Sequence, residues 1–299
     1  MEGTSSGRSL ASVVTKIIKV LICTDSRGAG LNELITEARL NALDDNTQIK
    51  VKVVIEVRRG AKIEELVKLA EIRRCAGKYD HCIVIGGICN LTVRHREEGK
   101  QFLTYTDRGS PQTIKNSIDG CLNTGDNQIF FSTVTPASII KHYAYYNSNE
   151  KPYQEDLVRE QQEHLIEDCT ELNKYIREKN EEKHLPTLAL AGLVYQSTKK
   201  RDHRTKKLKT QYRFSDRHLY DGVHLDAELK QRWATVILQF IGKIIKLNRS
   251  TADRGEEQTD SQSDDPSQPG TSYPPLQSTD SSESGGENSN FKRRKTNTH

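Results

Sequence analysis

The feature that most constrains the fold is an alternation of apolar segments with amphipathic segments along most of the chain. Five segments have the pattern of strands, being either mostly apolar or alternately apolar and polar: residues 16–23, 48–57, 81–85, 128–134 and 187–195. Between them, apolar residues recur at helical spacing, beginning with Leu31, Leu34, Ile35 and Ala38. This alternation predicts a three-layer α/β/α domain around a mostly parallel, five-stranded sheet.

The two ends of the chain differ in composition from this middle part. Residues 1–14 are mostly small or polar, and Ser, Asp, Glu, Gln, Pro and Gly dominate from Arg249 onward. Such segments bury too little apolar surface to offset the entropy cost of ordering them. We therefore predict a folded domain over residues 15–247, flanked by a disordered N-terminus (1–14) and a disordered, acidic, Ser-rich tail (248–299). The tail ends in the basic cluster KRRK at 292–295, which fits a nuclear-import signal, a nucleic-acid contact or a solvated charge run.

The bulk properties argue against several classes of protein. The 299 residues carry a formal net charge of +4, too small by itself to indicate nucleic-acid binding, and the mean hydropathy is −0.73. No run approaches the ~18 apolar residues of a membrane span, and the first residues do not resemble a secretory signal. The six cysteines form no CxxC pair, which favours reduced thiols and argues against a zinc site. We expect an intracellular protein, cytoplasmic or nuclear, with neither metal nor cofactor.

Polar residues follow several of the predicted strands at the point where each strand ends. Asp25 and Ser26 come after the first strand, Gly60 after the second, and GGICN (86–90) after the third. An Asp221-Gly222-Val223-His224 segment precedes the last predicted helix. A serine at such a turn is most often a helix cap, but ligand sites of parallel sheets lie at this edge. Serine, histidine and aspartate gathered there are the side chains of a nucleophilic hydrolase.

These segments resemble the motif blocks of the SGNH, or GDSL-type, hydrolases. The Gly-Asp-Ser block of that family matches Thr24-Asp25-Ser26, its second-block glycine matches Gly60, and its Asp-x-x-His block matches residues 221–224. The resemblance implies a flavodoxin-like α/β/α fold and the hydrolysis of small ester or acyl substrates.

The same resemblance implies a role for each matching residue. Ser26 is the expected nucleophile, His224 its general base, and Asp221 the residue that orients and stabilises the imidazole. The backbone N–H groups of Ser26 and Gly60 are the expected donors to the oxyanion.

Two positions depart from the family pattern. Thr24 replaces the first-block glycine, and Cys89 stands where the third block, Gly-x-Asn-Asp, has its asparagine. Because a thiol is a poor hydrogen-bond donor, the oxyanion hole lacks a member unless Asn90, one residue later, reaches it through a shifted turn. We expect Asn90 to be that third donor. The loss of one donor typically lowers turnover by ~10²–10³-fold.

A basic segment precedes the Asp221–His224 block. It contains Lys199, Lys200, Arg201, Arg204, Lys206, Lys207 and Lys209. With the aromatic residues that follow, it is suited to binding single-stranded nucleic acid, to steering an anionic substrate, or to forming a solvated loop. The phrases DSRGAGL, GICNLT and DGVHL also resemble SGNH-type domains encoded by animal LINE-type retrotransposons. The sequence thus supports two hypotheses: a serine esterase, or a catalytically weakened SGNH scaffold that binds nucleic acid or protein. It does not predict the oligomeric state.

Overall fold

A computed structural model describes residues 14–35, 37–40, 47–106, 110–123, 128–147, 154–201, 204 and 208–256. Its central sheet has five strands in the order β2-β3-β1-β4-β7. They are β1 (Val14–Thr24), β2 (Glu37–Leu40), β3 (Thr47–Val57), β4 (His81–Ile85) and β7 (Ile129–Phe131). Every neighbouring pair is parallel except β2 with β3, so the predicted α/β class with a mostly parallel sheet is confirmed.

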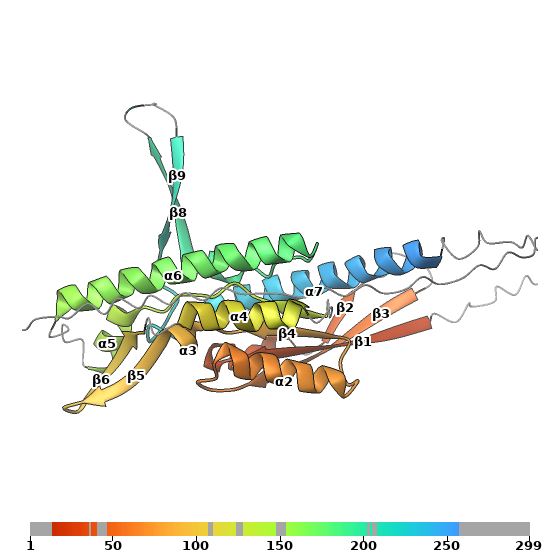
Figure 1. The fold of residues 1–299 in the computed structure, drawn as a ribbon, viewed down its shortest axis with the longest axis horizontal. Coiled ribbons are helices and arrows are strands. Elements are labelled where there is room, and N and C mark those ends of the chain that lie inside the picture. The colour runs from red at the N-terminus through yellow and green to blue at the C-terminus, as the bar shows by residue number, and fades with distance from the viewer. Residues whose placement is uncertain are drawn as a thin grey trace, which may run out of the picture. The chain divides into compact units, whose positions relative to one another are not determined.

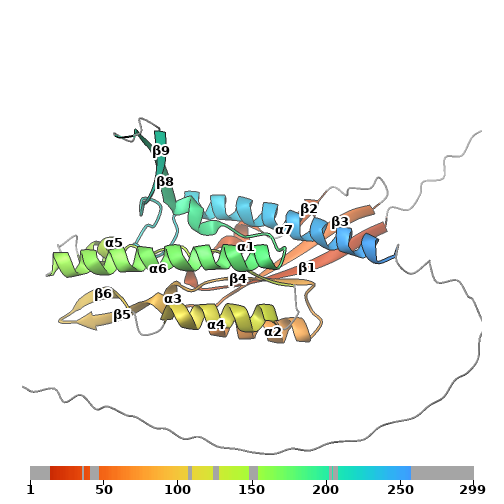
Figure 2. The same cartoon turned by 45° about the horizontal axis from the view of Figure 1, so that its top comes forward.

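Helices cover both faces of this sheet (Figures 1 and 2). Helices α2 (Ile63–Cys75) and α4 (Ser110–Asn123) lie on one face, and α7 (Ala227–Glu256) lies on the other. Alongside α4 runs the long helix α6 (Glu155–Glu182), which also packs on α5 (Ile139–Tyr146). Strand β4 is buried over all five residues, as expected of a parallel strand with helices on both sides.

The apolar stripes of the helices explain this packing. Helix α2 buries Ile63, Leu66, Val67 and Ala70 at helical spacing against β1 and β4. On the opposite side, Phe240 of α7 meets the ring of Phe130 in β7, with centroids 5.6 Å apart. The layers therefore share one apolar core that fixes the carboxyl ends of the parallel strands at a common edge.

The sheet has the expected number of strands but not all the expected members. The predicted strand over residues 187–195 is wrong: Leu188 forms a single bridge to Ser132, and Leu190–Val194 form the 3₁₀ helix η2. A short apolar run of this kind does not distinguish a strand from a buried helical turn. The predicted first helix is also interrupted, because α1 ends at Leu34 and Ala38 belongs to β2, opposite Val51 of β3.

Two β-hairpins extend from the layers. One consists of β5 (Thr92–Glu97) and β6 (Lys100–Tyr105), and the other of β8 (Tyr195–Arg201) and β9 (Leu208–Phe214). The basic segment at 199–209 belongs to the β8–β9 hairpin, which projects away from α6 in Figure 1. In the described part of the chain, no helix has the length and apolar character needed to cross a membrane.

Helix α7 extends beyond residue 247, the predicted end of the folded domain. Residues up to Asp253 belong to one compact unit, and the last three described residues, 254–256, fall outside it. Helix α7 continues to Glu256, so the tail predicted to be disordered from residue 248 begins with helix. Residues 1–13 and 257–299, including the KRRK cluster, lie outside the described residues.

Candidate active site

Strand β1 delivers Ser26 to the carboxyl edge of the sheet. The strand ends at Thr24, and Ser26 begins the short 3₁₀ helix η1 (Ser26–Gly28), which Asp25 caps by accepting the N–H of Arg27 at 2.9 Å. Thr24 stands where the family pattern has glycine, and a Cβ placed on Gly28 would collide with its side chain. A glycine four residues later thus makes room for the threonine in this turn.

The Asp25 carboxylate is occupied by a buried ion pair. Arg27 donates from Nη2 to Asp25 Oδ2 at 3.0 Å and from Nε to Oδ1 at 3.2 Å, and a further bond reaches the carbonyl of Thr135. Burial lowers the pKa of Arg27, but the adjacent carboxylate raises it more, so the guanidinium stays charged. Asp25 therefore braces the turn beneath Ser26 and is not available as a base.

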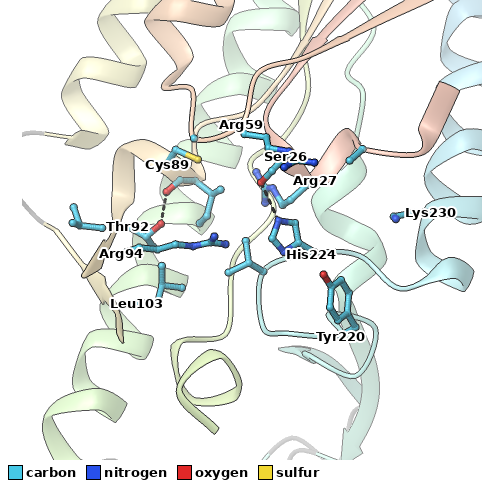
Figure 3. A pocket seen from close by; sticks show the side chains of 15 residues that line it. Ser26, Arg27, Arg59, Cys89, Thr92, Arg94, Leu103, Tyr220, His224 and Lys230 are labelled. Atoms are coloured by element: carbon cyan, nitrogen blue, oxygen red, sulfur yellow. Dashed lines mark hydrogen bonds between the residues drawn. The ribbon is translucent and has the colours of Figure 1, made fainter. Parts of the chain in front are cut away.

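Ser26, His224 and Asp221 form a continuous chain of polar contacts, although the serine and the histidine lie 198 positions apart in the sequence. Figure 3 shows the contact between His224 and Ser26. His224 Nε2 lies 3.1 Å from Ser26 Oγ, and His224 Nδ1 lies 2.7 Å from Asp221 Oδ2. A carboxylate can only accept a hydrogen bond, so Nδ1 carries the proton and Nε2 presents a lone pair to the serine hydroxyl. This is the arrangement needed to remove the hydroxyl proton.

Asp221 is buried and held in its charged form. Burial raises the pKa of its carboxyl, but the His224 ring and the N–H groups of His224 and Val223, at 2.7 and 3.0 Å from Oδ1, lower it more. The net pKa is well below the ordinary value. Tyr146 of α5 also donates its hydroxyl to Oδ2, at 3.2 Å. Asp221 is therefore a fixed anion beside the imidazole at neutral pH.

The turn that carries Asp221 and His224 is docked on α5. Gly222 adopts φ +82°, and a Cβ on it would collide with the carbonyl oxygen of Ser138 and with the backbone of His142. In return, the Ser138 N–H donates to the Gly222 carbonyl at 2.7 Å. Only glycine fits this close approach, and the contact sets the distance of His224 from Ser26.

A pocket of about 610 Å³ opens beside Ser26 and His224. Tyr220 stacks against the His224 ring with centroids 5.8 Å apart. The sequence analysis did not single out several residues of this pocket, because their elements reach it only in the folded chain. Those residues are Arg94 and Val93 of β5, Leu103 of β6, Tyr220, and Lys230 of α7.

Of the residues expected to donate hydrogen bonds to the oxyanion, some line the pocket and one does not. Gly60 lines the pocket at φ +72°, and no acceptor for its N–H exists among the described residues. Cys89 of α3 (Ile88–Leu91) lines the pocket as well. Asn90 does not, so the structure does not place the predicted third donor at the site. Its amide oxygen accepts the N–H of Ile63 and its amide nitrogen donates to Glu64, both at 2.8 Å. Within α3, successive side chains diverge by about 100°, which turns Asn90 away from the pocket and onto the start of α2.

The basic segment lies apart from this pocket. Of its described residues, Lys199, Arg201 and Arg204 are exposed and none lines the pocket; Lys200 and Lys209 pair across the β8–β9 hairpin. Lys206 and Lys207 lie outside the described residues. Across the part of the chain that the structure covers, no three His, Cys, Asp or Glu side chains cluster in a way that could hold a metal.

No protein-family profile and no curated protein sequence matches the chain. The chain does match solved structures of hydrolases. A lipase/acylhydrolase from Enterococcus faecalis is 17% identical, with 75% of this chain and 95% of that one covered and a TM-score of 0.45. A GDSL-like lipase from Bacteroides thetaiotaomicron is 12% identical over 76% and 88% of the two chains (TM-score 0.45). The acetyl xylan esterase AlAXEase is 15% identical over 74% and 98% (TM-score 0.42). At these TM-scores the likeness carries no functional argument, and a function must be inferred from the side chains of the site.

Proposed function

We propose that this protein is a serine hydrolase that cleaves carboxylic esters. Ser26 is the nucleophile and His224 is the general base. Asp221 holds the imidazole in place and stabilises it when it becomes protonated. The observation that carries the proposal is the chain of contacts from Asp221 Oδ2 through His224 to Ser26 Oγ, at 2.7 and 3.1 Å, which ends in an open pocket. A serine that merely capped a helix would not need a histidine, held by a buried aspartate, aimed at its hydroxyl.

The proposed reaction has two steps. His224 Nε2 takes the proton of Ser26 as Oγ attacks the ester carbonyl, and the resulting oxyanion faces the N–H groups of Ser26 and Gly60. The protonated imidazole then gives its proton to the departing alkoxide, which leaves as the alcohol, and an acyl-serine forms. Water, deprotonated by the same imidazole, attacks the acyl-serine; the imidazolium then returns that proton to Ser26 Oγ, which releases the acid and restores the free serine and the neutral base.

The number of hydrogen-bond donors to the oxyanion determines how fast we expect the ester to be hydrolysed. With the Asn90 amide bound to α2 and a thiol at Cys89, the oxyanion has no side-chain amide donor from α3. One missing donor typically lowers turnover by ~10²–10³-fold. We therefore expect a slow esterase rather than an inactive protein.

Cys89 is an alternative nucleophile in the same pocket, and its electrostatics argue against that role. Burial and the nearby Asp25 carboxylate raise the pKa of the thiol to about 11. At neutral pH the sulfur therefore carries its proton, whereas the thiolate is the form that attacks carbonyl groups.

Hydrolysis of short-chain p-nitrophenyl esters by the purified full-length protein tests the proposal. Turnover that is abolished by Ser26→Ala and kept within a few-fold by Cys89→Ala is the expected result. Turnover that persists in Ser26→Ala, or that disappears in Cys89→Ala while the protein stays folded, would overturn the assignment of the nucleophile.

A second candidate function is binding of single-stranded nucleic acid by the β8–β9 hairpin. The hairpin exposes Lys199, Arg201 and Arg204, and Tyr212 is 73% exposed, so phosphate contacts and base stacking are both available. This is the function expected from the resemblance to retrotransposon-encoded domains. Binding of a labelled oligonucleotide that weakens steeply with salt and with Tyr212→Ala, but not with Ser26→Ala, would support it. An affinity for the oligonucleotide that changes neither with salt nor with Tyr212→Ala would refute it.

A further inference from the structure

The charges that line the Ser26 pocket are all basic. Four cationic side chains, Arg27, Arg59, Arg94 and Lys230, contribute to its wall, and no aspartate or glutamate is among the residues that line it. Arg27 is neutralised by Asp25 beneath the turn. Among the described residues, the side chains of the other three have no carboxylate within ion-pair distance. Within the part of the chain that the structure describes, three of the four positive charges of the pocket therefore have no ion-pair partner.

Three separate elements bring these charges to one place. Arg59 follows β3 next to Gly60, Arg94 lies on β5, and Lys230 lies in the first turns of α7. The Lys230 ammonium is held over the turn after Ser26, with Nζ 3.6 Å from where a Cβ on Gly30 would stand. In Figure 3, Arg94 and Lys230 lie on opposite sides of the Ser26–His224 pair. All three cations therefore line the same pocket as Ser26 and His224.

The positive charge of Arg94 affects the pKa values of groups on two sides of the pocket. Burial lowers the pKa of His142, behind the Asp221 turn, to about 4, and the Arg94 guanidinium contributes to that decrease. Burial and Asp25 raise the pKa of Cys89, on the other side, whereas Arg27 and Arg94 lower it. In Figure 3 the guanidinium extends toward the space between Cys89 and His224. Arg94 therefore faces the space where the substrate would lie.

We propose that Arg59, Arg94 and Lys230 form an anion subsite, and that the substrate is an ester with a carboxylate or phosphate a few bonds from the scissile carbonyl. This inference rests on the proposed esterase function of Ser26 for its catalytic part. Arg59 and Arg94 are exposed and Lys230 is half-buried; an uncharged ester offers these cations no partner, whereas an anionic ester supplies their counter-charge. The subsite is specificity-determining: it selects among esters and takes no part in the proton transfers.

The test compares matched anionic and neutral esters in the full-length protein. One pair is the p-nitrophenyl ester of glutaric acid, with a free carboxylate, against p-nitrophenyl valerate. The other is an acetate ester of glycerol phosphate against glycerol monoacetate, which separates a phosphate on the alcohol from a carboxylate on the acyl group. The measured quantity is the ratio of kcat/KM, anionic over neutral, within each pair.

We expect that ratio to exceed about 10 for at least one pair and to fall about two- to fivefold with each of Arg59→Gln, Arg94→Gln and Lys230→Gln. Arg96→Gln is the matched control, since Arg96 is exposed on the same strand as Arg94 but does not line the pocket. It should leave both ratios unchanged. Ratios of one or less for both pairs, or ratios that the three pocket variants do not lower, would overturn the subsite.

Direct binding separates this inference from the esterase itself. If no ester of either charge is turned over, the proposed function fails, but titration calorimetry with glutarate and with inorganic phosphate still tests the subsite. Binding to Ser26→Ala that is weakened by Arg94→Gln and unaffected by Arg96→Gln would support the subsite. If neither anion binds Ser26→Ala, or if Arg94→Gln and Arg96→Gln bind alike, the subsite does not exist.

Discussion

Replacing Asp221 with asparagine removes one charge from the buried end of the polar chain and leaves the shape of the side chain almost intact. The oxygen that accepts the N–H groups of Val223 and His224 can be kept, so the turn should still fold. The other position becomes an NH₂ group facing His224 Nδ1, where a carboxylate oxygen lies at 2.7 Å. An NH₂ group donates, so Nδ1 must become the acceptor and the proton moves to Nε2, opposite Ser26.

Two effects then add up in the free energy of activation. The imidazolium formed on proton transfer loses an anionic partner, and a charge pair about 4 Å apart is worth about 4 kcal/mol at an effective dielectric constant near 20. That alone corresponds to about 10³-fold in rate. The wrong tautomer adds a further loss, because Nε2 no longer has a free lone pair. We expect Asp221→Asn to lower kcat by about 10³–10⁴-fold.

The assay is single-turnover and steady-state hydrolysis of a p-nitrophenyl ester, with urea denaturation of each variant to show that it is folded. Asp226→Asn is the matched control. Asp226 also lies beside a histidine, with Oδ2 2.9 Å from Nδ1 of His218, but neither residue lines the pocket. It should change kcat by no more than a few-fold. An Asp221→Asn protein that is folded and within tenfold of the wild-type kcat would refute the role assigned to the carboxylate.

Three further predictions concern the residues around the site, and each is measured by urea denaturation. Gly222→Ala should lower the free energy of unfolding by about 2–4 kcal/mol, because the new Cβ would collide with the backbone of α5 at a residue with positive φ. Gly120→Ala, in open space on α4, is the control and should be neutral or stabilising. Equal effects of the two substitutions would contradict the close packing assigned to Gly222. His142 is buried, and its pKa in the folded protein is about 4, below the ordinary value of about 6.5. Below pH 6.5 the unfolded chain therefore binds more protons than the folded protein does. The free energy of unfolding should fall by about 3 kcal/mol between pH 6.5 and pH 4. His142→Phe should lack that loss, and an unchanged pH slope would disprove the assignment. Asn90→Ala should lower the free energy of unfolding by about 1–2 kcal/mol, because the N–H of Ile63 at the start of α2 loses its acceptor, and it should change kcat less than twofold. A 10²-fold loss of kcat would show that Asn90 donates to the oxyanion after all.

The periodicity argument finds four of the five strands of the central sheet, including β3, where exposed residues alternate with buried ones. Residues 81–85 are apolar throughout and coincide with β4, and Gln128–Val134 contains β7. Because parallel strands end at one edge of a sheet, the sequence could also indicate that Ser26 and the 221–224 block meet there. The edge strand β2 was missed because its Ala38 also fits the helical spacing of Leu31, Leu34 and Ile35. A short edge strand with one partner has no strong pattern of its own.

The rest of the site depends on contacts between distant segments, which local patterns do not encode. Arg94 belongs to a strand whose residues, Arg94 included, are mostly exposed, so the sequence gives no sign that this arginine lines a pocket. Lys230 looks like an ordinary polar residue of an amphipathic helix. Asn90 matched a motif to within one residue, yet one residue in a helical turn is enough to move its side chain from the pocket to the start of α2.

The measurement that tests the central claim most directly is active-site labelling of the full-length protein with a fluorophosphonate, followed by peptide mapping by mass spectrometry. An activated serine attacks this reagent without needing the natural substrate. We predict one adduct per chain, on the peptide that contains Ser26, and at least a 10²-fold slower reaction in His224→Gln. No adduct, an adduct on another residue, or labelling of Ser26 at the same rate in His224→Gln would contradict the claim that His224 activates Ser26.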